Sequence, residues 1–260
     1  MGLILCEKNS VENPLYIDDL GLNIYSLEEL CYVIYSYPYT SLDGLVNDRF
    51  NSFVNNELGL PVHGDNSDDL LISILNFSDY YSSPEVEKFK QKMHDIRKLS
   101  RCDFYKNKGD YLFSSGKFGK AKLSYDTSLK EASYQNTDAS VYGVIYKRIG
   151  ACSANMFDYD SAFEAYTKAF SYLQDVSVLK SIYFLAKQQP VIDKREKYLE
   201  YLNDRVERDW DQEYENVLTE SYSCKAIEDF DSGLDTDSIK KKQYIAENIE
   251  KLKLRYRLMV

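Results

Sequence analysis

The side chains best suited to catalysis are few and scattered. His63 and His94 are the only histidines, and neither has a cysteine or a second histidine at the spacing of a zinc site. A histidine-based triad is equally unsupported, and we expect His94 to lie on a helix surface. The sequence contains no glycine-rich phosphate loop and no nucleophile elbow. The sequence therefore predicts a protein that is not an enzyme, with no catalytic residues, no metal and no cofactor.

An acidic stretch near the C-terminus has the residue types of a calcium loop. Its aspartates surround Gly233 and are Asp229, Asp231, Asp235 and Asp237. The glycine falls one residue early for an EF-hand, and Lys240 stands where that loop needs a bidentate glutamate. We therefore expect a solvated acidic loop over residues 228–237. No other pair of carboxylates is singled out for acid–base chemistry.

Charge and cysteine usage limit the partners and the compartment. The chain has 260 residues and a net charge of −10, which disfavours nucleic acid and anionic membranes as partners of the whole chain. The cysteines are odd in number and dispersed, which favours reduced thiols: Cys6, Cys31, Cys102, Cys152 and Cys224. No apolar run reaches the ~18 residues of a membrane span, and the start of the chain is too short in apolar residues for a signal peptide. We expect a cytoplasmic protein.

The first hundred residues are predicted to be mainly helical. Residues 1–25 are the least helical, and LILCE and PLYI favour short extended pieces, with a small β-hairpin as one alternative. Four helices are predicted over 26–99. Ser26, Ser41 and Ser67 are expected to cap the first three, and the fourth is expected to open at Ser83–Pro84. A DNA-binding helix-turn-helix is an alternative there, but no helix concentrates the Arg, Lys, Asn and Gln that read bases.

Two helical hairpins follow, with small and aromatic residues at matching positions. Tyr, Gly, Ala and Tyr recur with a period of 41 residues, as Tyr105, Gly109, Ala121 and Tyr125 and then as Tyr146, Gly150, Ala162 and Tyr166. Glycine and alanine at fixed offsets indicate close approach of two helix backbones. We expect the flanking aromatic rings to fill the space between hairpins. A third unit begins after Ser177 but lacks the matching glycine and alanine.

The C-terminal part is predicted to contain two further helices. One is expected over 191–219, with Leu199, Leu202, Val206 and Trp210 on one face. The other is expected over 238–258, and residues 238–260 carry seven Lys and Arg against two Glu, a net charge of +5. We expect its apolar side, with Ile245, Ile249, Leu252 and Tyr256, to dock on the preceding helices. Binding to an acidic partner, a membrane surface or RNA is the alternative.

The offsets in the hairpins resemble the tetratricopeptide repeat (TPR). Gly109, Gly150, Ala121 and Ala162 match its small residues, and tyrosines replace its tryptophan and phenylalanine. The chain departs from the pattern by Lys108 for leucine, by Leu112 and Ser153 for tyrosine, by the missing terminal proline and by the longer period. The resemblance implies a curved array of helical hairpins with a concave peptide-binding groove. An ordinary helical bundle with coincidental spacing is the alternative.

One TPR subclass clamps the terminal carboxylate of chaperone tails, with a lysine and an asparagine in the first repeat and an asparagine in the second. Lys106 matches the lysine, but Asp110 and Arg148 replace the two asparagines. Because Asp110 would repel a carboxylate, the full clamp is not expected. Lys147 and Arg148 still place cations beside the predicted groove, although a solvated helix face is the alternative for these basic residues.

The sequence thus predicts an all-α protein with three parts. These are an N-terminal helical domain (1–99), TPR-like repeats (100–190) and C-terminal capping helices (191–260). The predicted function is a non-enzymatic adaptor that binds a protein or peptide segment. The residues expected to line its groove are Lys106, Asp110, Phe113, Lys147, Arg148, Ala151 and Asn155. The alternative function is a peptide-sensing signalling regulator, in which the ligand shifts the N-terminal helices.

Overall fold

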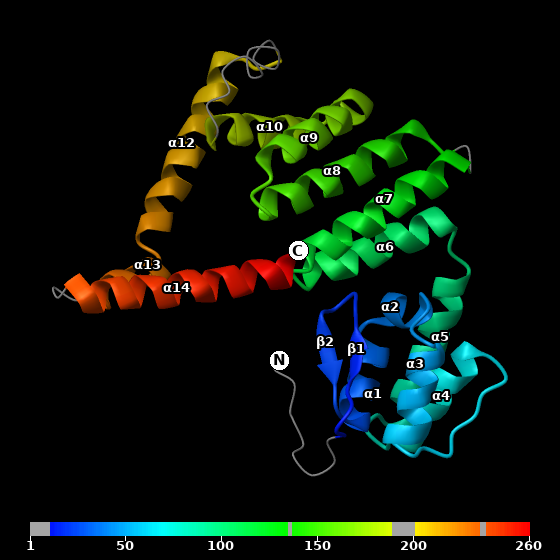
Figure 1. Cartoon of the computed structure of the whole chain (residues 1–260). Helices are drawn as coiled ribbons and strands as arrows, with labels where there is room; N and C mark the ends of the chain where they lie inside the picture. The colour runs from blue at the N-terminus through cyan, green and yellow to red at the C-terminus, as the bar shows by residue number, and fades with distance from the viewer. Residues whose placement is uncertain (1–10, 135–136, 189–200, 235–237) are drawn as a thin grey trace. The chain divides into compact units, whose positions relative to one another are not determined.

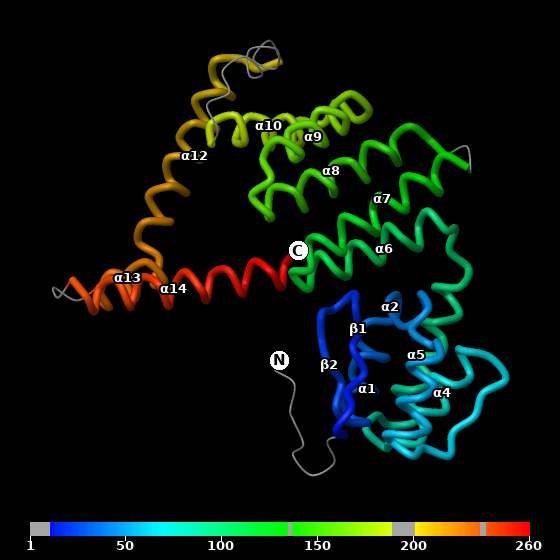
Figure 2. The backbone as a smooth tube through the Cα atoms, in the orientation of Figure 1, coloured from blue at the N-terminus to red at the C-terminus, as the bar shows by residue number. Residues whose placement is uncertain are grey.

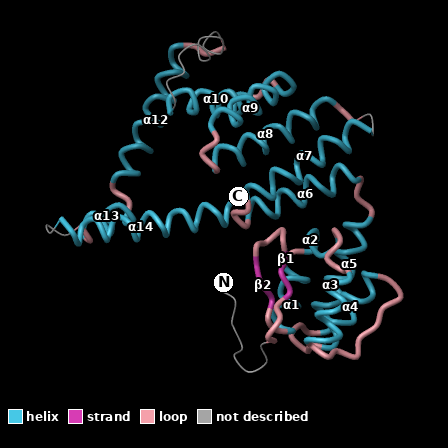
Figure 3. The backbone as a smooth tube through the Cα atoms, viewed as in Figure 1, coloured by secondary structure: helices cyan, strands magenta, loops and turns pink. Residues whose placement is uncertain are grey.

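Helices dominate the fold, and the all-α class predicted from sequence is confirmed (Figure 3). The computed structural model describes residues 11–134, 137–188, 201–234 and 238–260. By its internal packing, the chain divides into two compact units, residues 1–136 and 137–260. The boundary falls inside the segment predicted to hold the repeats, and the three-part division stays a prediction.

The first unit begins with a small antiparallel hairpin of strands β1 (Leu15–Ile17) and β2 (Leu22–Ile24). Leu15 pairs with Ile24, and the turn uses Gly21 at φ +61°, a left-handed conformation that glycine adopts without strain. Leu15, Ile17 and Ile24 are buried, so one face of the hairpin packs inward. The small β-hairpin, given from the sequence as one alternative for this stretch, is present, whereas the LILCE stretch lies outside the described residues.

The helical elements of the first unit follow in sequence order (Figure 1). They are α1 (Leu27–Ser36), α2 (Pro38–Leu42), α3 (Asp48–Ser52), the π-helix η1 (Phe53–Glu57), α4 (Ser67–Phe77), α5 (Ser83–Arg97), α6 (Arg101–Ser114) and α7 (Phe118–Tyr134). Their core is aromatic and aliphatic, with Leu30, Phe50, Leu71, Ile74 and Phe89 almost fully buried. The ring of Tyr35 stacks on Tyr81 and Phe89 at 4.1 and 5.4 Å between ring centroids, which ties α1 to α5.

Local capping explains where these helices begin, with two corrections. The Ser26 hydroxyl accepts from the Glu29 N–H at 3.2 Å, as predicted. The predicted cap at Ser41 is wrong, because Ser41 lies within α2 and the next helix is capped by Asn47. The predicted cap at Ser67 is also wrong, because the Asn66 side chain, one residue earlier, accepts from the Asp69 N–H. In both cases, an asparagine offers a side-chain oxygen at least as good as that of serine.

The described helices of the second unit are α8 (Ala139–Asn155), α9 (Tyr159–Leu173), α10 (Val176–Gln188), α12 (Asp204–Tyr222), α13 (Lys225–Ser232) and α14 (Ser238–Met259). In the backbone trace, α6 with α7 and α8 with α9 form the two expected hairpins, each of two antiparallel helices (Figure 2). The core of the second unit joins α9, α10 and α12 through Phe170, Leu179, Ile182, Tyr183 and Trp210.

The C-terminal elements differ from the prediction at three points. The helix expected over 191–219 begins only at Asp204, where Asn203 caps α12; residues 191–200 lie outside the described part. The acidic stretch expected to be a loop includes α13. The expectation that α14 docks its apolar side on preceding helices is wrong, because no residue of α14 is buried.

Candidate functional site

The matching glycines of the two hairpins are packing residues. A Cβ on Gly109 would lie 2.6 Å from Cε1 of Tyr125, and one on Gly150 would lie 2.8 Å from Cδ1 of Tyr166. Both distances are shorter than any normal contact, so each ring requires glycine opposite it. Tyr125 and Tyr166 each pack against the glycine of their own hairpin, and Tyr166 also belongs to the core shared with α10. The expectation that these aromatics fill the space between hairpins stays a prediction.

The predicted contact residues of α6 are engaged with one another and with α7. Lys106 Nζ lies 3.2 Å from Asp110 Oδ2, and the Tyr125 hydroxyl donates to Asp110 Oδ1 at 2.7 Å. The Phe113 ring meets Phe118 at 5.1 Å between centroids. The Asp110 carboxylate is thus held by a cation and a hydroxyl. Lys106, Asp110 and Phe113 are half-buried, and Tyr125 is fully buried.

The predicted contact residues of α8 form a second group in the second unit. Lys147 Nζ lies 2.6 Å from the Ser177 hydroxyl and 3.3 Å from Asp175 Oδ2, which joins α8 to the start of α10. Hydrogen bonds from Ser177, together with Lys147, lower the pKa of Asp175. Arg148 is exposed, and Asn155 donates to the carbonyl of Ala151 at 2.8 Å. A groove shared by the α6 and α8 residues stays a prediction.

Lys108 occupies a position that sequence reasoning noted only as a departure from the repeat pattern. Its side chain is 8% exposed, and its Nζ lies 2.6 Å from both Asp19 Oδ2 and Asp43 Oδ2. Burial alone would lower the pKa of Lys108, but the two carboxylates outweigh burial and raise it. The Tyr105 hydroxyl also donates to Asp43, at 3.2 Å. This cluster fastens α6 to the β-hairpin and to the end of α2.

A polar pocket of about 350 Å³ lies beside the Lys108 cluster, lined partly by Thr40, Asn47 and Arg49. Most of its charged groups already have partners. Lys108 pairs with Asp19 and Asp43, and Asp18 accepts from Lys120 at 2.5 Å. We therefore interpret this pocket as part of the packing between the strands and α6.

The larger cleft of the first unit combines apolar walls with carboxylates. Its volume is about 580 Å³, and the residues that line it are Val11, Glu12, Leu27, Glu28, Glu57, Leu58 and Leu60. They come from the segment before β1, the first turn of α1, the end of η1 and the residues that follow η1. The described lining contains no lysine or arginine. The cleft therefore presents apolar surface together with negative charge.

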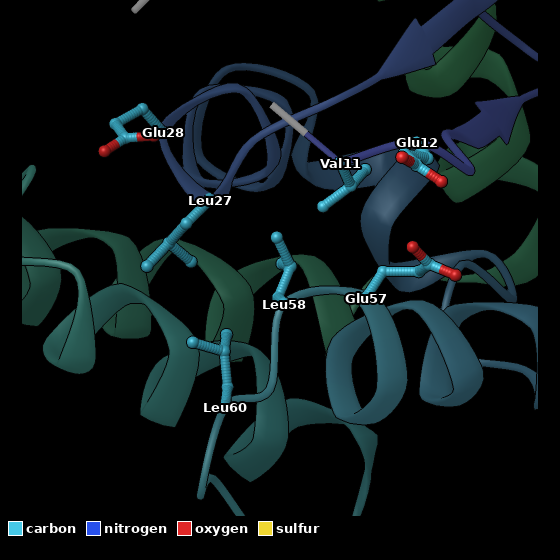
Figure 4. Close-up of a pocket in the computed structure, with 7 residues that line it drawn as sticks. All are labelled: Val11, Glu12, Leu27, Glu28, Glu57, Leu58 and Leu60. Atoms are coloured by element: carbon cyan, nitrogen blue, oxygen red, sulfur yellow. The ribbon is translucent and has the colours of Figure 1, made fainter. Parts of the chain in front are cut away.

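The close-up of this cleft shows how its side chains lie (Figure 4). Val11, Leu27 and Leu58 converge on one space, Glu12 and Glu57 lie together at one side, and Glu28 points away from it. The Asn13 amide donates to Glu57 Oε1 at 3.0 Å, which fixes that carboxylate at the rim. Sequence reasoning missed this cleft, because its residues are spread over 50 positions and share no motif.

The histidines, cysteines and carboxylates of the described part do not form a metal cluster. Among those residues, no three of His, Cys, Asp and Glu are arranged to hold a metal ion. His63 lines a separate pocket of about 280 Å³, together with Asn55 and Asn66. Burial raises the pKa of the Cys31 thiol to about 11, which keeps it protonated and unreactive at neutral pH.

Comparisons with protein families, with curated proteins and with solved structures find no match. Among the described helices, none combines the length and apolar character that crossing a membrane requires.

Proposed function

We propose that the protein is a non-enzymatic, cytoplasmic binding protein that holds a peptide or protein segment. The observation that carries this proposal is the 580 Å³ cleft of the first unit, with its four apolar side chains and three carboxylates. A complementary ligand has an apolar side chain that packs against Val11, Leu27 and Leu58. It also has a lysine or arginine that pairs with Glu12 and Glu57. A short peptide segment meets both requirements at once.

The hairpins supply the second part of the proposal. We retain the TPR-like interpretation, in which the first helix of each hairpin presents contact residues. Arg148 and Asn155 are exposed on α8, and Lys147 is half-exposed beside them. This surface is cationic where the cleft is anionic, so the two surfaces prefer peptide segments of opposite charge.

A signalling regulator is the second candidate, and the position of the cleft favours it. The cleft borders the first turn of α1 and the π-helix η1, in which the Leu58 N–H donates to the Phe53 carbonyl at 3.0 Å. Single-turn π-helices are rare in proteins, and those that occur are often found at functional sites. A peptide bound in the cleft would therefore contact the N-terminal helices directly and bias their conformation.

Fluorescence anisotropy with two labelled probe peptides tests the proposal. One probe alternates leucine and lysine, and the other alternates leucine and glutamate. We expect the basic probe to bind, and Glu12→Lys with Glu57→Lys to weaken it about tenfold, or ~1.4 kcal/mol. The matched control reverses two exposed glutamates elsewhere, Glu87→Lys with Glu164→Lys.

The second probe separates the two surfaces. Lys147→Glu with Arg148→Glu should weaken the acidic probe and leave the basic probe unchanged. If the cleft and control variants lose the basic probe equally, the cleft is not the binding site. For the regulator, amide exchange over residues 27–60 should slow on addition of the basic probe, and an unchanged pattern would contradict it.

A further inference from the structure

The last helix of the chain exposes its apolar side chains. Within α14, Ile249 is 44% exposed, Leu252 61%, Leu254 58% and Tyr256 43%. No residue of this 22-residue helix is buried. Exposed side chains of this size and number along one helix mark an interaction surface.

The apolar residues of α14 follow the spacing of a helix–helix seam. Ile245, Ile249, Leu252, Tyr256 and Met259 are separated by four, three, four and three residues. This alternation is the heptad pattern that packs against a partner helix along its whole length. Lys253 and Arg255 flank the stripe on its two sides, where coiled coils place the charges that select a partner.

The contacts of α14 with α13 lie near the start of the helix. The Tyr244 ring packs on Phe230 at 5.6 Å between centroids, and its hydroxyl donates to the Asp229 carbonyl at 3.3 Å. Gly233 lets this ring approach, since a Cβ there would lie 2.3 Å from the ring. These contacts anchor the first turns, whereas Leu252, Leu254 and Tyr256 lie two turns or more beyond them.

Charge indicates which kind of helix would complete the seam. Residues 238–260 carry +5, whereas the whole chain carries −10. Residues 201–237 contain twelve Asp and Glu and three Lys and Arg, a net charge of −9. Two α14 helices from different copies would repel each other, because both are basic. The acidic segment 201–237 has the charge that is complementary to α14.

The acidic segment also has unused apolar surface. The first half of α12 packs on α10, where the Trp210 and Tyr183 rings lie 5.6 Å apart. Beyond that contact, Val217 is 59% exposed, Tyr222 69% and, in α13, Ile227 38%. Glu215 and Glu220 of α12 are also exposed. The end of α12 thus offers the apolar and acidic groups that α14 requires.

We propose that α14 of one copy packs on the α12–α13 segment of a second copy, and that the second copy does the same in return. Each copy then contributes one basic helix and one acidic segment, which is the self-complementary arrangement of a two-fold symmetric dimer. The partner of this surface is therefore a second copy of the chain.

Sedimentation velocity on the full chain over a concentration series tests the proposal. The wild-type chain should form a dimer, and an increase from about 50 mM to about 500 mM NaCl should raise the Kd about tenfold, because exposed charge pairs are screened. Lys253→Glu with Arg255→Glu should give a monomer. Glu215→Lys with Glu220→Lys should also give a monomer.

Mixing the two monomeric variants gives the sharpest outcome. In a mixed dimer, the reversed side chains of the two variants face each other at one contact and two unaltered segments meet at the other, so the dimer should return. The matched control, Lys88→Glu with Lys90→Glu on the exposed face of α5, should dimerise like the wild type. Circular dichroism of each variant checks that its helices are intact.

Three outcomes would overturn the proposal. One is a wild-type chain that is monomeric throughout the series. Another is a mixture of the two variants that stays monomeric although both are folded. The third is a monomeric chain that binds phosphatidylserine vesicles through α14, which would assign the surface to an anionic membrane.

Discussion

The two hairpins share a packing scheme but use one equivalent position in opposite ways. In both, a glycine faces a tyrosine of the second helix, and a fully buried alanine follows. One residue before each glycine, the first hairpin has Lys108 and the second has Ile149. Both residues are 6% exposed.

The residue type at this position depends on the side chains that surround it in the fold rather than on its place in the repeat. Lys108 is tolerated because Asp19 and Asp43 each approach to 2.6 Å. Ile149 lies in a hairpin whose helices bury aliphatic and aromatic residues. A repeat can therefore keep its small residues while an adjoining position adapts to a different surface.

The largest expected effect comes from removing the lysine. Lys108→Met leaves two carboxylates close together without their cation and should lower the free energy of unfolding by about 3 kcal/mol. Ile149→Met, a change of similar size at the equivalent position, should cost less than about 1.5 kcal/mol. Urea unfolding followed by circular dichroism measures both. Equal losses would show that the two positions do not differ.

Two further measurements sharpen this result. Adding Asp19→Asn and Asp43→Asn to Lys108→Met should recover stability, because the uncompensated charges are removed. The pKa of Lys108 is raised in the folded state, so its contribution is complete below the unfolded value of about 10.4 and is lost as pH rises through the folded value. The difference between wild type and Lys108→Met should therefore shrink at alkaline pH.

A smaller effect should be common to both hairpins. Gly109→Ala and Gly150→Ala each place a Cβ within 3 Å of a tyrosine ring, so each should lower stability by about 2 kcal/mol. This loss exceeds the gain of about 1 kcal/mol that alanine brings to a helix. Combining Gly109→Ala with Tyr125→Leu should cost less than the sum of the two changes. If Gly150→Ala instead raised the free energy of unfolding, the Tyr166 ring would not be confined by Gly150.

The smallest effect is a gain in the second hairpin. Leu112 of the first hairpin is matched by Ser153, whose hydroxyl is buried with no hydrogen-bond partner among the described residues. Ser153→Ala should raise the free energy of unfolding by about 1 kcal/mol. The matched control is Ser124→Ala, which should instead lower it slightly, because Ser124 donates to the Lys120 carbonyl at 3.2 Å. Thermal unfolding of both variants tests the contrast.

Local signals predicted most of the elements. The capping serine at Ser26, the two hairpins and the last helix lie where the sequence placed them. The errors occur where two local signals compete, as at Asn47 and Asn66, which cap helices whose caps were expected to be serines. The predicted contact residues lie on α6 and α8, but only the structure shows that Asp110 and Lys147 have partners within the chain.

The all-α class, the two hairpins and the tight packing at Gly109 and Gly150 could be predicted from the sequence, because they depend on residues close together along the chain. The sequence did not show that a tyrosine ring, rather than a helix backbone, approaches each glycine. Other contacts became visible only in the folded chain. The carboxylates that pair with Lys108 precede it by more than 60 residues, and the cleft combines residues from three separate segments. Sequence spacing carries no information on such contacts, since they form only when distant segments pack together.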